Sequence, residues 1–370
     1  MRIEASLLYA FYMMIFLVMP TLSWANETRA KVLHLTFHRG CASEFAAVAH
    51  ELAFDLETWF IPDLPPGSFD GVSSGNALYN IGQVRAENIW NLHKSYFETF
   101  DAIIVSDTAP LSRIFLQNDW KKPLIIWVCN RFDYSDTASL DCDFPDPLYY
   151  QLFKEACSKN NVKVIAYTEF EHYYAKSKGI ETGGLTITPG VALNDAALNQ
   201  PSIPDWVKKE EAFFLPPYLN ESVFIDLPNL CNKLGIDCYR GRYSSASELS
   251  SFKGIIHLPY AWSNLAFFEN IGLGIPYFIP SYSFLRELVS SGNYFHTNTS
   301  CLLENEGDAL SEWYCKEHAD FIVYFDSWED LRKKIDSTDF LALREKIKNY
   351  AVLNRSTMIN RWKNVFENVL

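Results

Sequence analysis

Two polar residues follow apolar, strand-like runs in the first third of the chain. His38 comes directly after KVLHLTF, and Asp107 follows FDAIIVS. An imidazole whose pKa lies near neutrality can take up a proton, and a neighbouring carboxylate can orient the ring. The pair is therefore a candidate general base with its supporting acid. The alternative is a hydrogen-bonded polar pair at the edge of a sheet, without any chemistry.

Two further polar groups lie where strands are predicted to end. Asn130, Arg131 and Asp133 follow the apolar run KPLIIWVC, and their side chains suit the binding of ligand hydroxyl groups better than catalysis. Arg240 and Arg242 stand in YRGRY in the second half of the chain. They are candidate contacts for phosphate groups, or plain surface charges.

One acidic residue, Glu269, interrupts the apolar run HLPYAWSNLAFFENIGLGIPYFIPS. It is either a hydrogen-bond acceptor for a ligand at the end of a cleft or a helix residue paired with Arg286. Ser263 and Asn264 stand where the helix of this run is expected to begin. Unpaired backbone N–H groups at such a position favour anion binding.

The elements that must position these residues alternate between strand and helix. Strands that are apolar on both faces and separated by helices predict parallel sheets with both faces covered. A helix with Ser43 as its N-cap is expected after the first strand, and two separate helices are expected at the C-terminus. The pattern restarts after a polar, Pro-containing stretch. We expect two Rossmann-like α/β domains that face a cleft, and a last helix that packs back on the first domain. The expected boundaries are 31–191 for the first domain, 192–205 for the linker, 206–350 for the second domain and 351–370 for the last helix.

The quoted run and the two-domain pattern resemble the glycosyltransferases of the GT-B fold. Glu269, Gly274 and Pro276 stand in the places where that family has a glutamate followed by a small-residue turn and a G-x-P. The chain departs from the pattern in two places. Ala261 replaces a second glutamate found in many retaining members, and the glycine-rich loop after the first strand is reduced to HRGC.

The resemblance implies the transfer of a sugar from an activated donor, nucleotide-linked or lipid-linked, to a hydroxyl group of a glycan, protein or lipid acceptor. The first domain would hold the acceptor and the second the donor. The resemblance implies that Glu269 binds the donor ribose and that His38 acts as the base, supported by Asp107. Arg240, Arg242 and the helix start at Ser263 and Asn264 would bind the donor phosphates. The side chains of Asn130, Arg131 and Asp133 would bind the acceptor hydroxyls.

Charge and composition narrow the classes of partner. The net charge of −13 argues against a general nucleic-acid-binding protein, which needs a basic surface. The triplet DCD (141–143) resembles a metal-binding motif of another glycosyltransferase fold, but no further ligands cluster near it in the sequence. We read it as solvated, and we expect neither a metal site nor a cofactor.

The first 25 residues resemble a signal peptide. A basic residue, an apolar stretch and the small residues Ser23 and Ala25 precede a mature chain that would begin near Asn26. The alternative is an uncleaved membrane anchor, and only then would the chain associate with a membrane. The expected location is the secretory lumen, the periplasm or the exterior.

In such a compartment cysteines are candidates for disulfides. The pairs Cys231–Cys238 and Cys301–Cys315 could close short loops, and at least one is expected to be oxidised. Cys129 ends an apolar run and is expected to be a buried free thiol.

Two other functions fit the same pattern. An exported two-lobed protein that captures a small ligand shares the leader, the linker and the cleft, but needs no base. A catalytically inactive transferase-like protein is allowed by Ala261 and the reduced glycine loop.

Overall fold

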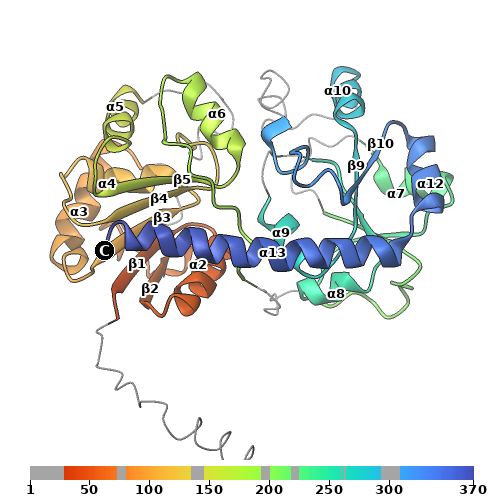
Figure 1. Ribbon diagram of the computed structural model, residues 1–370, viewed down its shortest axis with the longest axis horizontal. Coiled ribbons are helices and arrows are strands. Elements are labelled where there is room, and N and C mark those ends of the chain that lie inside the picture. The colour runs from red at the N-terminus through yellow and green to blue at the C-terminus, as the bar shows by residue number, and fades with distance from the viewer. Residues whose placement is uncertain are drawn as a thin grey trace, which may run out of the picture.

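The computed structural model describes residues 29–72, 81–134, 146–192, 201–217, 225–259, 261, 264–292 and 309–370. The predicted leader, the DCD triplet, Ser263 and Cys301 lie outside these residues. Two five-stranded parallel sheets stand side by side, and one long helix runs along both of them (Figure 1). The predicted α/β class with two parallel sheets is confirmed. In the described residues no helix is long and apolar enough to cross a membrane.

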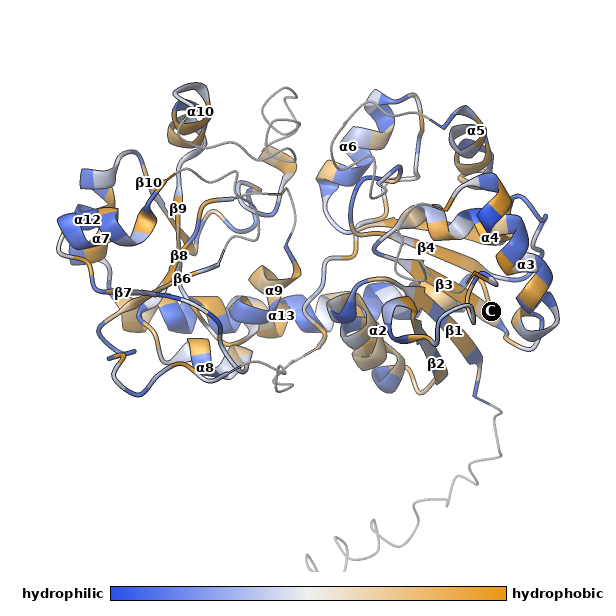
Figure 2. Ribbon diagram, turned by 180° about the vertical axis from the view of Figure 1, so that it is seen from behind, coloured by the Kyte–Doolittle hydropathy of each residue, from blue (hydrophilic) through white to orange (hydrophobic). Residues whose placement is uncertain are grey.

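The first sheet has the strand order β2-β1-β3-β4-β5. Its central strands β3 and β4 are buried along their whole length, as expected for a sheet covered on both faces. The strands appear hydrophobic in Figure 2. The strands are β1 (Lys31–Thr36), β2 (Asp55–Phe60), β3 (Ala102–Ser106), β4 (Leu124–Val128) and β5 (Val162–Ala166). The helical segments are α2 (Arg39–Glu51), η1 (Ile61–Asp63), α3 (Gln83–Phe97), η2 (Ala109–Ser112), α4 (Arg113–Leu116), α5 (Pro147–Ala156) and α6 (Glu169–Ser177).

The start of α2 corrects the sequence analysis. Ser43 lies inside the helix, and the N-cap is His38, so the chain passes from β1 into α2 within two residues. The sequence analysis also missed β2, an edge strand whose residues are only partly buried. Its sequence DLETWF lacks the continuous apolar run that marked the central strands.

The second sheet has the order β10-β9-β8-β6-β7. Its strands are β6 (Phe213–Leu215), β7 (Cys238–Arg240), β8 (Gly254–Ile256), β9 (Tyr277–Pro280) and β10 (Ile322–Phe325). Its helices are α7 (Leu227–Lys233), α8 (Ala246–Ser250), α9 (Leu265–Gly272), α10 (Tyr282–Ser290) and α12 (Trp328–Ser337). Cys231 and Cys238 are free thiols, so the structure does not show the disulfide expected between them. That bond stays a prediction.

The C-terminal region is a single 28-residue helix, α13 (Phe340–Glu367), where the sequence analysis expected two helices. No Gly or Pro interrupts it. Its apolar pattern breaks at Val352 and Leu353, which are 67% and 69% exposed, because the helix there passes from one domain to the other. The ring centroid of Trp362 lies 5.4 Å from that of Phe45 and 5.4 Å from that of Trp127, and both of these residues belong to the first domain.

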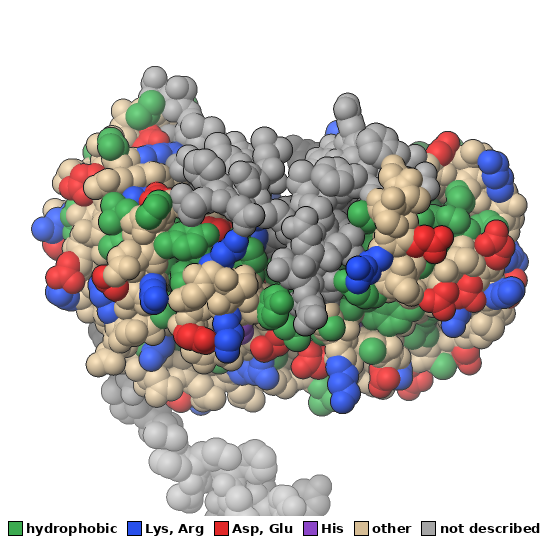
Figure 3. Space-filling model, turned by 90° about the horizontal axis from the view of Figure 1, so that it is seen from above, with side chains coloured by type: hydrophobic (Ala, Val, Ile, Leu, Met, Phe, Trp, Pro, Cys, Tyr) green, Lys and Arg blue, Asp and Glu red, His purple; other side chains and the backbone are tan. Residues whose placement is uncertain are grey.

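Acidic and basic side chains are intermixed on the face of the molecule seen from above, and no large area of one sign stands out there (Figure 3).

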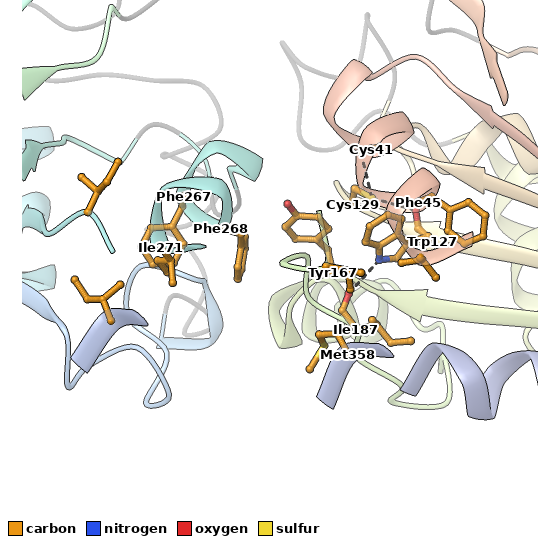
Figure 4. Packing of buried hydrophobic residues seen from close by; sticks show 14 of the residues in the cluster. Cys41, Phe45, Trp127, Cys129, Tyr167, Ile187, Phe267, Phe268, Ile271 and Met358 are labelled. Carbon is orange, nitrogen blue, oxygen red and sulfur yellow. Dashed lines mark hydrogen bonds between the residues drawn. The ribbon is translucent and has the colours of Figure 1, made fainter. Parts of the chain in front are cut away.

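One core cluster joins the two domains. It contains residues from both sheets and from α13. At the boundary, the rings of Tyr167 and Phe268 meet edge to face at 5.6 Å, one from each domain. Figure 4 shows them facing each other, with Cys41, Cys129 and Trp127 on the side of Tyr167 that is away from Phe268. The domains are therefore held together by buried apolar contacts as well as by the chain connection.

Candidate functional site

A pocket of about 130 Å³ lies at the carboxyl ends of the central strands of the first sheet. Ligands of parallel α/β sheets bind at this edge. The second domain closes the pocket with the start of α9. The lining residues are His38, Cys41, Asp107, Cys129, Asn130, Tyr167, Asn264 and Leu265.

His38 stands at the junction of β1 and α2, where the residue is partly open to solvent and its imidazole lines the pocket. Its Nδ1 accepts a hydrogen bond of 3.4 Å from the backbone N–H of Cys41, which makes it the N-cap of α2. Its own backbone N–H donates to Thr36 Oγ1 at 3.2 Å. Because the strand ends at Thr36 and the helix starts at Arg39, the imidazole is fixed directly over the end of the sheet.

Asp107 occupies a tight turn after β3. The N–H of Thr108 donates to the carbonyl oxygen of Ser106 at 2.9 Å, and Asp107 between them has a φ of 65°. Such a φ is uncommon outside glycine and stores strain, which in folded proteins often accompanies a functional site. The turn holds a buried carboxylate. Its two oxygens accept from Asn130 Nδ2 at 3.1 Å and from Thr108 Oγ1 at 3.3 Å.

The two ionisable groups influence each other. Burial raises the pKa of Asp107, partly offset by the charge of His38 and by the two hydrogen bonds. Burial lowers the pKa of His38, but Cys41, Asp107 and Glu269 outweigh this effect and raise it to about 9. The hydrogen bond from the Cys41 N–H acts in the opposite sense, because only an unprotonated Nδ1 can accept it.

Glu269 lies in α9 and is partly exposed. Its negative charge raises the pKa of His38 and, after burial, that of Tyr243. The helix-pairing alternative placed it beside Arg286. The guanidinium of Arg286 lies 5.7 Å from the centroid of the Tyr282 ring and lines a different pocket.

The first turn of α2 and the start of α9 approach each other closely. A Cβ atom at Gly40 would lie 2.2 Å from Leu265 Cδ2 and 3.0 Å from His38 Cε1. The glycine of HRGC therefore lets the two domains meet beside His38. Asn264 caps α9, and its Oδ1 accepts from the Ala266 N–H at 3.0 Å.

The structure brings five of the sequence-predicted residues to this boundary: His38, Asp107, Asn130, Asn264 and Glu269. Arg131, Asp133, Arg240 and Arg242 do not line the pocket, and Ser263 lies outside the described residues.

Arg131 and Asp133 are both buried, and Arg131 Nε lies 3.9 Å from Asp133 Oδ1. Asp133 accepts hydrogen bonds from the hydroxyl groups of Tyr150 and Tyr174, so its carboxylate supports the core. Arg240 and Arg242 are exposed at the end of the edge strand β7 and are not among the residues that line the pocket.

Sequence reasoning missed the roles of Cys41, Cys129 and Tyr167 in the lining. A signal existed for the cysteines: Cys41 lies three residues after His38, and Cys129 directly precedes Asn130.

A second pocket, of about 560 Å³, was also missed. It lies beyond the end of β9 in the second domain, and tyrosine rings line it together with Arg286. The rings of Tyr314 and Tyr324 stack at 5.9 Å, and Tyr282 meets Tyr314 at 5.5 Å. The described part of the chain contains no group of three or more His, Cys, Asp or Glu side chains arranged to hold a metal ion.

No family model matches the chain, and no curated protein matches it in sequence. Solved structures with a similar fold include UGT71G1 of Medicago truncatula complexed with UDP-glucose. It is 10% identical, with 90% of this chain and 98% of that chain covered and a TM-score of 0.49. UGT89C1 of Arabidopsis thaliana complexed with UDP-L-rhamnose is 8% identical, with coverages of 92% and 100% and a TM-score of 0.48.

A putative UDP-N-acetylglucosamine 2-epimerase from Listeria monocytogenes is 13% identical, with coverages of 87% and 91% and a TM-score of 0.46. The three likenesses are at identities of 8% to 13% and TM-scores of 0.46 to 0.49.

Proposed function

We propose that the chain is a glycosyltransferase that moves a sugar from an activated donor to a hydroxyl acceptor at the boundary between its domains. The observation that carries the proposal is the pocket of His38. It joins an imidazole and a buried carboxylate from the first domain to the start of α9 from the second. Glu269 approaches the same imidazole closely enough to raise its pKa.

In this proposal His38 removes the proton from the acceptor hydroxyl as its oxygen attacks the sugar carbon. The nitrogen free to take a proton is Nδ1, whose contact with the Cys41 N–H is long at 3.4 Å and can be exchanged for the hydroxyl. The negative charge of Asp107 stabilises the imidazolium ion that forms. Asn130 holds that carboxylate and remains the candidate contact for the acceptor.

In this proposal the second domain binds the donor. Glu269 would accept hydrogen bonds from the sugar hydroxyls of the donor, beside the helix start at Asn264. The tyrosine-lined pocket beyond β9 offers flat surfaces for stacking and a cation in Arg286. Arg286 is therefore a candidate phosphate contact in addition to Arg240 and Arg242.

The proposal includes export, which rests on the sequence alone. A lumenal enzyme needs an imported nucleotide sugar, and an enzyme of a bacterial envelope needs a lipid-linked donor. Amino-terminal sequencing of the secreted chain tests this part: a mature end near Asn26 supports it, and an intact leader contradicts it.

A ligand-capturing protein without turnover is the second candidate. Such proteins usually open and close about a hinge. Here α13 and the shared core hold the domains together, which favours a fixed site.

The test is a panel of nucleotide sugars and lipid-linked sugars, screened by thermal shift on the purified chain and followed by calorimetry. We expect one donor to raise the melting temperature. Glu269→Gln should weaken its binding by about 10-fold to 150-fold, the equivalent of 1.5–3 kcal/mol for a charge-assisted hydrogen bond.

Glu345→Gln, an exposed change on α13, is the matched control and should leave donor affinity unchanged. If no donor shifts the melting temperature and Glu269→Gln only lowers it, Glu269 is structural and the proposal fails.

A further inference from the structure

Two cysteines lie in contact inside the candidate site. Cys41 Sγ and Cys129 Sγ are 3.8 Å apart, within hydrogen-bonding distance for sulfur. One comes from the first turn of α2 and the other directly follows β4, and both are almost fully buried, at 2% and 6% exposure. In Figure 4 a dashed line joins the two cysteines beside Tyr167.

The two thiols have different surroundings. The hydrogen bond with Cys129 and the neighbouring His38 lower the pKa of Cys41 to about 7, against the effect of burial. Burial raises the pKa of Cys129. Of the two cysteines, Cys41 is therefore the one that more readily becomes a thiolate. The thiolate is the form that attacks an oxidant.

The size of the pocket limits which oxidant reaches the sulfur atoms. Both cysteines line the pocket of about 130 Å³, and each is almost completely covered by neighbouring atoms. A small oxidant such as hydrogen peroxide therefore reaches their sulfur atoms more easily than a bulky one such as a tripeptide disulfide.

From this geometry we infer that Cys41 and Cys129 form a peroxide-reactive dithiol that closes to a disulfide inside the candidate site. The Cys41 thiolate attacks one oxygen of hydrogen peroxide, the O–O bond breaks, and hydroxide leaves, which gives a sulfenic acid. The sulfur of Cys129, losing its proton, then attacks the sulfur of Cys41 and displaces water. In total, two thiols and one peroxide give one disulfide and two waters.

Closing the bond moves the residues that carry the site. The sulfur atoms must approach from 3.8 Å to about 2 Å, the length of a disulfide bond. Cys41 belongs to the helical turn that His38 caps and that meets Leu265 at Gly40. Oxidation therefore displaces the imidazole. The expectation that oxidation stops turnover rests on the proposed function. The expectation that the disulfide forms does not depend on it.

The test is peptide mapping of the purified chain after treatment with hydrogen peroxide and alkylation of the remaining thiols. We expect a Cys41–Cys129 cross-link that dithiothreitol reverses. Cys129→Ser should instead leave a sulfenic acid on Cys41, trapped by dimedone. Cys157→Ser removes a thiol at the end of α5, away from the pocket, and should cross-link as the wild type does.

The proposal is overturned if Cys41 and Cys129 stay alkylatable on unfolding after peroxide treatment, or if oxidation pairs either of them with another cysteine. Turnover gives a separate readout. Peroxide should reduce the wild-type rate about 100-fold, reversibly, and leave Cys41→Ser at its own untreated rate. A cross-link in a chain that transfers no sugar in any form would uphold the dithiol and overturn the proposed function.

Discussion

At the scale of single residues, Asp107 is the residue whose conformation and chemistry are most closely linked. Its φ of 65° places the carboxylate in the pocket, where Asn130 and Thr108 hold both oxygens. Asparagine tolerates this backbone conformation better than other residues. A change to Asn therefore removes the charge while it preserves the turn.

We expect Asp107→Asn to move the pH dependence of turnover to lower pH. The neutral imidazole of His38 is the active form, so the wild-type rate should rise with pH until its pKa of about 9 is passed. Asp107 raises that pKa, and its removal lowers it. The plateau rate should fall by about 100-fold, because the imidazolium ion loses its counter-charge. A pH–rate profile measures both the apparent pKa of the base and the plateau rate.

Asp101→Asn is the control, at the opposite end of the same strand. Its carboxylate accepts the Lys31 N–H at 2.7 Å, far from the pocket, so the variant should lose some stability and keep the wild-type profile. An unchanged or raised apparent pKa in Asp107→Asn would rule out His38 and Asp107 as a coupled base.

Some site residues could be predicted from the sequence, because neighbouring parallel strands end at the same edge of a sheet. β1, β3 and β4 are neighbours, so the residues after them, His38, Asp107 and Asn130, reach one edge. Arg131 and Asp133 belong to the same loop as Asn130, but their side chains turn into the core, and no sequence spacing distinguishes these directions. The tyrosine pocket was not predictable, because Tyr282 comes 32 residues before Tyr314 in the chain, and no spacing in the sequence links it to Tyr314 and Tyr324.

At the scale of elements, the junction between α2 and α9 decides the shape of the pocket. The sequence interpretation treated HRGC as a reduced glycine-rich loop. The structure shows a helix start in which Gly40 gives room to Leu265 and His38. The single glycine thus has a steric role between domains.

We expect Gly40→Ala to reduce turnover more than stability. Alanine favours the helix by about 1 kcal/mol. Its Cβ, however, would lie 2.2 Å from Leu265 Cδ2, so that side chain or α9 must move beside the pocket. A displacement of this size can cost about 100-fold in rate. Melting temperature and steady-state kinetics on the same sample separate the two effects.

Gly82→Ala is the matched control, because its added Cβ meets no heavy atom within 4 Å. It should leave the rate unchanged. Wild-type turnover in Gly40→Ala would show that the approach of α9 to α2 has no part in the site.

At the scale of the whole molecule, α13 joins the two domains by specific contacts on both sides. In the second domain, Arg344 donates to backbone carbonyls that include Ser250 O at 3.3 Å, and Tyr350 packs 4.6 Å from Phe321. In the first domain, Arg355 pairs with Glu51 at 2.6 Å, and Trp362 is fully buried. Together with the shared core, these contacts predict that the domains unfold in one cooperative transition.

The exposed middle of α13 allows this coupling to be tested without removing any core side chain. We expect Val352→Pro to separate the unfolding of the two domains into two transitions in calorimetry. Proline removes one backbone hydrogen bond and clashes with the preceding turn, at a cost of about 3 kcal/mol or more. Val352 is 67% exposed, so Val352→Ala should retain a single transition at or slightly above the wild-type temperature. If Val352→Pro still unfolds in one transition, the shared core around Tyr167 and Phe268 couples the domains without the helix. If the wild type already unfolds in two transitions, the domains are independent and the pocket between them is not held fixed by either.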